Sequence, residues 1–93
     1  MKISTEDGPQ MADDTIRIPI RGFMSRSFDG RAVKDEDDIF ALGFANSLFA
    51  MQLVAFVEGQ FRIEIETDDL ELDNFRSVAA ISGLVERKMA ASQ

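Results

Sequence analysis

The chain has 93 residues, with 17 acidic residues against 10 basic ones, eight phenylalanines, and no cysteine, histidine, tryptophan or tyrosine. Its length and its 45% apolar content predict one small domain with a modest core. The missing residue types exclude disulfides, thiolate nucleophiles, cysteine-based zinc sites and histidine chemistry, and the net charge of −7 argues against nucleic acid as a partner. We therefore expect a protein that is not itself an enzyme.

The first predicted helix follows an N-terminal tail. Residues 1–14 carry many charges and few large apolar side chains, which predicts a disordered tail and leaves residues 15–93 as the domain. An apolar stripe then predicts a helix over residues 19–28, with Pro19 in its first turn and Gly30 ending it. The stripe consists of Ile20, Phe23, Met24 and Phe28. The alternating isoleucines of residues 16–20 leave a short strand as the alternative, which Pro19 disfavours.

The second predicted helix runs over residues 47–61. Asn46 is a suitable N-cap, and the only charge in the helix is Glu58. Apolar residues lie nearly all round it, although one helix of so small a bundle cannot be buried on every side. We expect Leu48 and Met51 to be exposed as a partner-docking surface. Two phenylalanines, at positions 49 and 56, either fill the core or add to that surface.

Two further helical segments complete the predicted fold. Residues 67–72 form one turn with acids at its start, and a last helix follows Ser77 as its cap and runs to about residue 90. The whole is an all-α, small four-helix bundle of three longer helices and one short helix. A calcium loop over residues 68–73 is excluded, because the spacing lacks the central glycine and the terminal glutamate.

The acidic charge is concentrated in one part of the chain. Residues 15–34 have a net charge of +4, residues 35–75 of −10, and residues 76–93 of +2. Asp68 and Asp69 are candidates for steering basic partners, although such runs are often only solvated turns. No apolar run approaches the ~20 residues of a membrane span and no signal peptide opens the chain, so we expect a cytoplasmic protein that binds no membrane. We also expect a monomer.

One site fits these features. Ser47 would present its hydroxyl at a capped helix start, where N–H groups and the helix dipole favour an anion such as an esterified phosphate. The segment of residues 38–48, DIFALGFANSL, resembles the acyl carrier protein signature of an acidic loop followed by Phe-x-Leu-Gly-x-x-Asp-Ser-Leu. The exit sequence FRIEI at residues 61–65 and the pair Ser77-Val78 also match that family, so the resemblance covers about residues 16–90.

The resemblance implies an acyl carrier domain over residues 15–93. By that likeness Ser47 is the attachment point for 4′-phosphopantetheine, which a phosphopantetheinyl transferase transfers from coenzyme A. Asn46, Leu48, Met51, Asp68 and Asp69 would then contact partner enzymes. The family usually has aspartate before the serine, whereas Asn46 keeps the capping geometry without the charge.

A narrower resemblance concerns residues 46–58 and 70–78. They look like the free-standing carriers of alkoxymalonyl extender units for polyketide synthases, which belong to antibiotic-type biosynthesis. That likeness implies a glycerate-derived hydroxymalonyl or methoxymalonyl cargo, with acyl-loading, dehydrogenase and methyltransferase enzymes and a synthase acyltransferase as partners. The alternatives are a carrier for another acyl or D-alanyl pathway, and a helical adaptor that carries no cofactor and docks partners through Leu48 and Met51.

Overall fold

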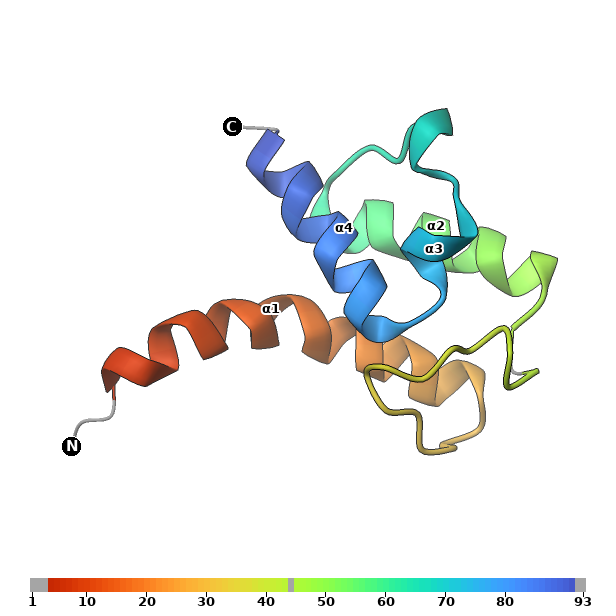
Figure 1. The fold of residues 1–93 in the computed structure, drawn as a ribbon, viewed down its shortest axis with the longest axis horizontal. Coiled ribbons are helices and arrows are strands. Elements are labelled where there is room, and N and C mark those ends of the chain that lie inside the picture. The colour runs from red at the N-terminus through yellow and green to blue at the C-terminus, as the bar shows by residue number, and fades with distance from the viewer. Residues whose placement is uncertain (1–3, 44, 92–93) are drawn as a thin grey trace.

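The computed structural model describes residues 4–43 and 45–91, with side chains from residue 15 onward. Its helices are α1 (Ser4–Ser27), α2 (Ser47–Phe61), the 3-10 turn η1 (Thr67–Asp69), α3 (Leu72–Phe75) and α4 (Val78–Ala91). The described residues contain no strand. Figure 1 shows α1, α2 and α4 around a common core, with η1 and α3 on the connection from α2 to α4. The predicted all-α bundle is therefore confirmed, and the strand alternative for residues 16–20 is wrong.

Helix α1 is longer than predicted. It begins at Ser4 and not at residue 19, so Pro19 lies in its interior and the placement of Pro19 in the first turn is wrong. The buried stripe explains the difference, because Ile16 continues the line of Ile20, Met24 and Phe28 by one further turn. The φ angle of proline suits a helix, and burial along this stripe offsets the one hydrogen bond that Pro19 cannot donate.

Helix α1 includes most of the N-terminal segment. The backbone of residues 4–14 is helical and continuous with the rest of α1, and residues 1–3 lie outside the described part of the chain. Extending an existing helix costs far less than nucleating one, so the packed part of α1 can propagate toward the N-terminus. Figure 1 shows these first turns, in red, reaching beyond the other helices. The division into a tail and a domain over residues 15–93 stays a prediction.

Helix α2 has the predicted bounds, and its phenylalanines lie in the core. Phe49 is buried and Phe56 packs partly buried against the core. The Phe23 ring of α1 lies between them, with its centroid 5.6 Å from that of Phe49 and 4.6 Å from that of Phe56. The Phe28 ring adds a further contact to Phe49 at 4.9 Å. The core alternative for residues 49 and 56 is therefore the right one, and α1 and α2 are joined by aromatic stacking.

The loop from α1 to α2 is fastened to the start of α4. Ser77 caps α4 as predicted, because its Oγ accepts a hydrogen bond from the Ala80 N–H. The Ala79 N–H, another donor of the first helical turn, donates to the backbone oxygen of Asp35 in the loop at 2.9 Å. Ile39, further along the loop, is completely buried. The loop that leads to α2 is thus part of the packed structure.

Asp35 joins α1 to the same loop through its side chain. Arg17 and Arg21 both donate to its Oδ2 atom, at 2.7 and 2.6 Å, and Arg21 also donates to Oδ1 at 2.9 Å. The hydrogen bonds from Arg21 are the largest cause that lowers the pKa of the Asp35 carboxyl. Partial burial raises this pKa and the hydrogen bond from Arg17 lowers it further, so that the pKa is about 2. Because the backbone oxygen of Asp35 accepts from α4, this one residue links α1, the loop and α4.

Among the described residues, no helix is both long and apolar enough to cross a membrane.

Candidate functional site

Ser47 is the first residue of α2, and its position is set by the cap in front of it. Asn46 has an extended backbone, and its Oδ1 accepts a hydrogen bond from the Phe49 N–H at 2.9 Å. The backbone oxygen of Asn46 accepts from the Ala50 N–H at 2.9 Å. The predicted cap is confirmed. Ser47 is exposed, and as the first residue of a 15-residue helix it lies at the positive end of the helix dipole.

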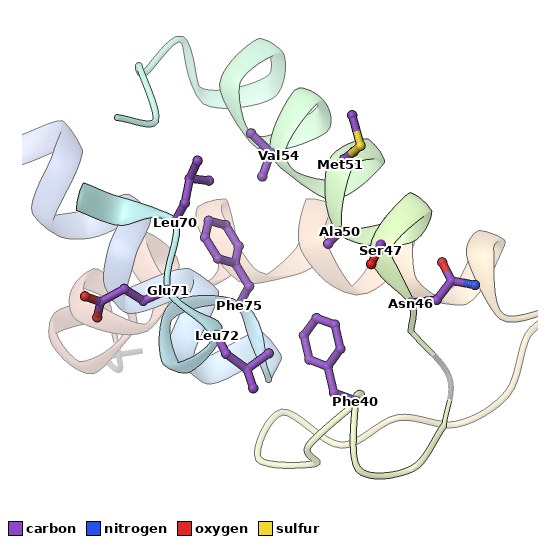
Figure 2. Close-up of a pocket in the computed structure, with 10 residues that line it drawn as sticks. All are labelled: Phe40, Asn46, Ser47, Ala50, Met51, Val54, Leu70, Glu71, Leu72 and Phe75. Carbon is purple, nitrogen blue, oxygen red and sulfur yellow. The ribbon is translucent and has the colours of Figure 1, made fainter. Parts of the chain in front are cut away.

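A cavity of about 420 Å³ lies beside Ser47. Its walls come from three segments that are far apart in the sequence: the loop before α2, the first two turns of α2, and the stretch around α3. The lining residues are Phe40, Asn46, Ser47, Ala50, Met51, Val54, Leu70, Glu71, Leu72 and Phe75. In Figure 2 the Ser47 oxygen lies on the side of α2 that faces the rings of Phe40 and Phe75, whereas the Glu71 carboxylate points away from the cavity. The interior surface is therefore apolar, with a hydroxyl at its rim.

The cavity was not predicted from the sequence. Leu70 directly follows η1, and Leu72 and Phe75 are the first and last residues of α3, so their common wall depends on how η1 and α3 cross α2. A signal was present in the repeated apolar positions of residues 70–75 within an otherwise acidic stretch. That pattern indicates a covered face, but it does not say which element lies opposite.

Exposed apolar side chains surround the same site. Leu48 is 65% exposed and Met51 71%, so the predicted exposure of both is confirmed. Leu42 in the loop, together with Leu70 and Leu72, is also more than half exposed. Apart from Ile18 on α1, these five are all the exposed large apolar residues of the described chain. Met51, Leu70 and Leu72 also line the cavity, and exposed apolar residues gathered at one site are typical of a surface that another protein or a ligand contacts.

The two acids proposed for docking have different environments. Asp69 is largely covered: its Oδ2 lies 2.7 Å from Lys88 Nζ and accepts a hydrogen bond from the Glu66 N–H at 2.9 Å. The hydrogen bond from Lys88 is the main reason that the pKa of Asp69 is lowered, and the same contact raises the pKa of Lys88. Asp68 is exposed. Asp69 thus fastens η1 to α4, and Asp68 is the one of the two that presents its charge to solvent.

The segment that contains α3 has polar contacts at both of its ends. Asn74 donates from Nδ2 to the backbone oxygen of Asp69 at 2.9 Å, and its Oδ1 accepts from Arg87 of α4 at 3.2 Å. Arg76 Nη2 lies 2.9 Å from Asp73 Oδ1 and Nη1 lies 3.8 Å from Asp38 Oδ2 in the loop. The apolar wall that this segment gives to the cavity is therefore positioned from α4 and from the loop.

The pKa is lowered at the carboxyls of Asp35 and Asp69 and raised at Lys88. All three groups belong to ion pairs, and none of them lines the cavity. Among the described residues, no group of three or more histidine, cysteine, aspartate or glutamate side chains could hold a metal ion. Ser47, with its exposed hydroxyl at a helix N-terminus, is the group at this site that suits covalent attachment of an anion. The first turn of α2 contains no acidic residue that would repel a phosphate there.

Comparison with known proteins agrees with this geometry. A family model described as phosphopantetheine attachment site matches residues 26–85, a range that contains Ser47 and every residue that lines the cavity. Neither the curated proteins nor the solved structures gave a match.

Proposed function

We propose a carrier function for this protein from the premise that the chain belongs to the family of phosphopantetheine attachment domains. Such a domain is the site at which 4′-phosphopantetheine is covalently attached, and it acts as a carrier and not as a catalyst. Carrier domains are modified by a phosphopantetheinyl transferase and interact with partner enzymes. The resemblance to acyl carrier proteins is therefore confirmed at the level of the family.

Ser47 is our candidate for the attachment residue. The observation that carries this proposal is its exposed hydroxyl at the capped start of α2, in a first turn without acids and beside an apolar cavity. In the transfer, the serine oxygen forms a bond to the phosphorus next to pantetheine in coenzyme A. The pyrophosphate bond breaks, 3′,5′-ADP leaves, and the serine proton goes to a base of the transferase. Helix α2 then favours the phosphodiester through its N-terminal dipole.

Intact-protein mass after incubation with coenzyme A and a broad-specificity phosphopantetheinyl transferase tests this assignment. We expect a gain of one phosphopantetheine in the wild type, none in Ser47→Ala, and an unchanged gain in Ser27→Ala, which removes an exposed serine at the end of α1. A gain that persists in Ser47→Ala would mean that another residue is the attachment point. No gain in the wild type would favour the adaptor that carries no cofactor.

The cargo we propose is a glycerate-derived hydroxymalonyl or methoxymalonyl unit for polyketide synthesis. The support is the likeness of residues 46–58 and 70–78 to alkoxymalonyl carriers. The cavity indicates where such a cargo would lie. Its lining contains no basic residue that could pair with a buried carboxylate, and burying an unpaired carboxylate costs several kcal/mol. A malonyl-type cargo would therefore stay in solvent at the rim, within reach of its dehydrogenase, methyltransferase and acyltransferase partners.

The mass of the species recovered from the native host tests the cargo. A hydroxymalonyl or methoxymalonyl thioester on Ser47 is the expected result. A saturated acyl chain or a D-alanyl group on the same serine would assign the protein to another carrier pathway and leave the attachment proposal intact.

Partner enzymes would contact the apolar residues around Ser47, with Asp68 adding attraction at a distance. Leu48 and Met51 are exposed and follow Ser47 in the first turns of α2. We propose them as contacts, with Asn46 beside them. Steering by charge is better tested at Asp68 than at Asp69, since reversing Asp69 would also break its contact with Lys88. Asp68→Lys should slow transferase turnover at low salt more than Glu86→Lys, which makes the same charge change on α4.

A further inference from the structure

The loop before α2 contacts the residue that follows α3, Arg76, next to the cavity. The Ile39 N–H donates to the backbone oxygen of Arg76 at 2.8 Å. The guanidinium of the same arginine reaches the loop as well, with Nη1 lying 3.8 Å from Asp38 Oδ2, and its Nη2 lies 2.9 Å from Asp73 Oδ1 within α3. Arg76 therefore bridges a carboxylate of the loop and a carboxylate of α3.

Asp38 uses its other oxygen to shape the loop. Its Oδ1 accepts hydrogen bonds from the Phe40 N–H and the Ala41 N–H, both at 3.0 Å. The carboxylate thus closes the turn that follows Ile39 while Oδ2 faces Arg76. Because Ile39 is completely buried, the turn has an apolar anchor on one side and the Asp38–Arg76 contact on the other.

Each side of the Asp38–Arg76 contact continues into a wall of the cavity. Phe40 follows Asp38 by two residues and Phe75 directly precedes Arg76, and both rings line the cavity beside Ser47 (Figure 2). The contact therefore lies between the loop wall and the α3 wall. Ser47 itself is held separately, by the Asn46 cap on α2.

We propose that Arg76 is a positioning residue for the loading of Ser47: through Asp38 it holds the loop in the shape that a phosphopantetheinyl transferase binds. This inference rests on the proposed carrier function. A transferase that acts on Ser47 must cover the surface around it, which includes the loop. A loop that is loose must be ordered on binding, which weakens binding. The hydroxyl stays in place on α2, so the chemical step does not change.

Four variants separate this role from general effects. Arg76→Gln and Asp38→Asn each remove the charge pair, and the side-chain amide oxygen introduced by Asp38→Asn can still accept the two backbone hydrogen bonds. They change the net charge in opposite directions, so a shared effect cannot arise from long-range electrostatics. Asp73→Asn is the matched control, because it weakens the shorter contact of Arg76 without touching the loop. Arg76→Lys keeps the charge and should restore part of the function.

Transfer kinetics with coenzyme A and the purified transferase give the first measurement. Arg76→Gln and Asp38→Asn should raise the KM for the carrier by up to about fivefold, the range expected for a partly exposed ion pair, with kcat unchanged. The double variant should be no worse than either single one. Asp73→Asn should match the wild type. A fall in kcat without a change in KM, or an equal rise in KM for Asp73→Asn, would overturn the proposal.

Amide hydrogen exchange gives a second measurement that needs no transferase. Exchange at Ile39, Phe40 and Ala41 should become faster in Arg76→Gln and Asp38→Asn, while the core amide of Leu53 keeps its wild-type rate. Unchanged exchange in the loop, or faster exchange at Leu53 as well, would refute a local coupling. A wild-type chain that the transferase does not modify would refute the carrier function, and exchange would still decide whether Arg76 holds the loop.

Discussion

Replacing Asp35 by asparagine should destabilise the protein, and the structure gives the size of the effect. The pKa of the carboxyl is about 2, against an ordinary 3.8. By linkage that difference corresponds to about 2.4 kcal/mol of unfolding free energy when the group is ionised. Arg21 is 46% exposed and Arg17 29%, so water screens the contacts, and we expect a loss of about 1–2 kcal/mol. The hydrogen bond from Ala79 should persist, because it uses the backbone of residue 35.

The pH dependence has a defined sign. Because the pKa of Asp35 is lower in the folded protein, its contribution is fully present above pH 3.8 and is lost as the pH falls toward 2. The difference between Asp35→Asn and the wild type should therefore be constant near neutral pH and narrow between about pH 4 and pH 2.

Urea unfolding and thermal unfolding, both followed by circular dichroism, suit this test, since the chain has no tryptophan or tyrosine for fluorescence. At pH 7 the expected loss corresponds to a fall in Tm of about 5–15 °C for a domain of this size. Glu36→Gln is the matched control, because it removes the same charge from the neighbouring exposed residue. Equal stability of the two variants at pH 7, or a gap that stays the same down to pH 2, would refute the reasoning.

Three further predictions concern the site and its supports. Asn46→Ala removes the cap of α2 and should cost about 1 kcal/mol in urea unfolding, whereas Asn46→Asp should cost nothing; equal losses would show that the cap does not stabilise the helix. Phe49→Ala should lower the free energy of unfolding by about 3 kcal/mol or more, because the Phe49 ring is buried. Met51→Ala, at an exposed position, should lower it by less than about 0.5 kcal/mol while raising the transferase KM. A stable Met51→Ala protein with an unchanged KM would remove Met51 from the docking surface. Asp69→Ala should speed exchange of the Glu66 amide, which donates to the side chain of Asp69, and Asp68→Ala should not. The reverse order would contradict the role given to Asp69.

Helix α2 and its cap could be predicted because the information is local. Asn46 precedes an unbroken run without proline, and the run carries a single charge, so both ends and the type of element follow from neighbouring residues. The exposure of Leu48 and Met51 could be predicted because α2 carries apolar residues on nearly every side, and one helix of a small bundle cannot be covered all round.

The start of α1 and the cavity could not be predicted for a common reason. A proline at position 19 is a local signal for a helix start, and only the burial of Ile16 against the other helices shows why the helix continues through it. The cavity depends on which face of η1 and α3 lies opposite α2, and no spacing within one segment determines that. The pairing of Asp69 with Lys88 is likewise a contact between distant parts of the chain.

The two backbone hydrogen bonds that fasten the loop have a consequence for the order of folding. They join Asp35 to Ala79 and Ile39 to Arg76, residues from opposite halves of the chain. A contact between distant residues contributes to stability only after it has offset the entropy of closing the chain between them. During synthesis, a chain that has not yet reached residue 76 contains Ser47 and all of α2 but lacks both partners of the loop. The two hydrogen bonds that fasten the loop before Ser47 can therefore form only once the start of α4 has been synthesised.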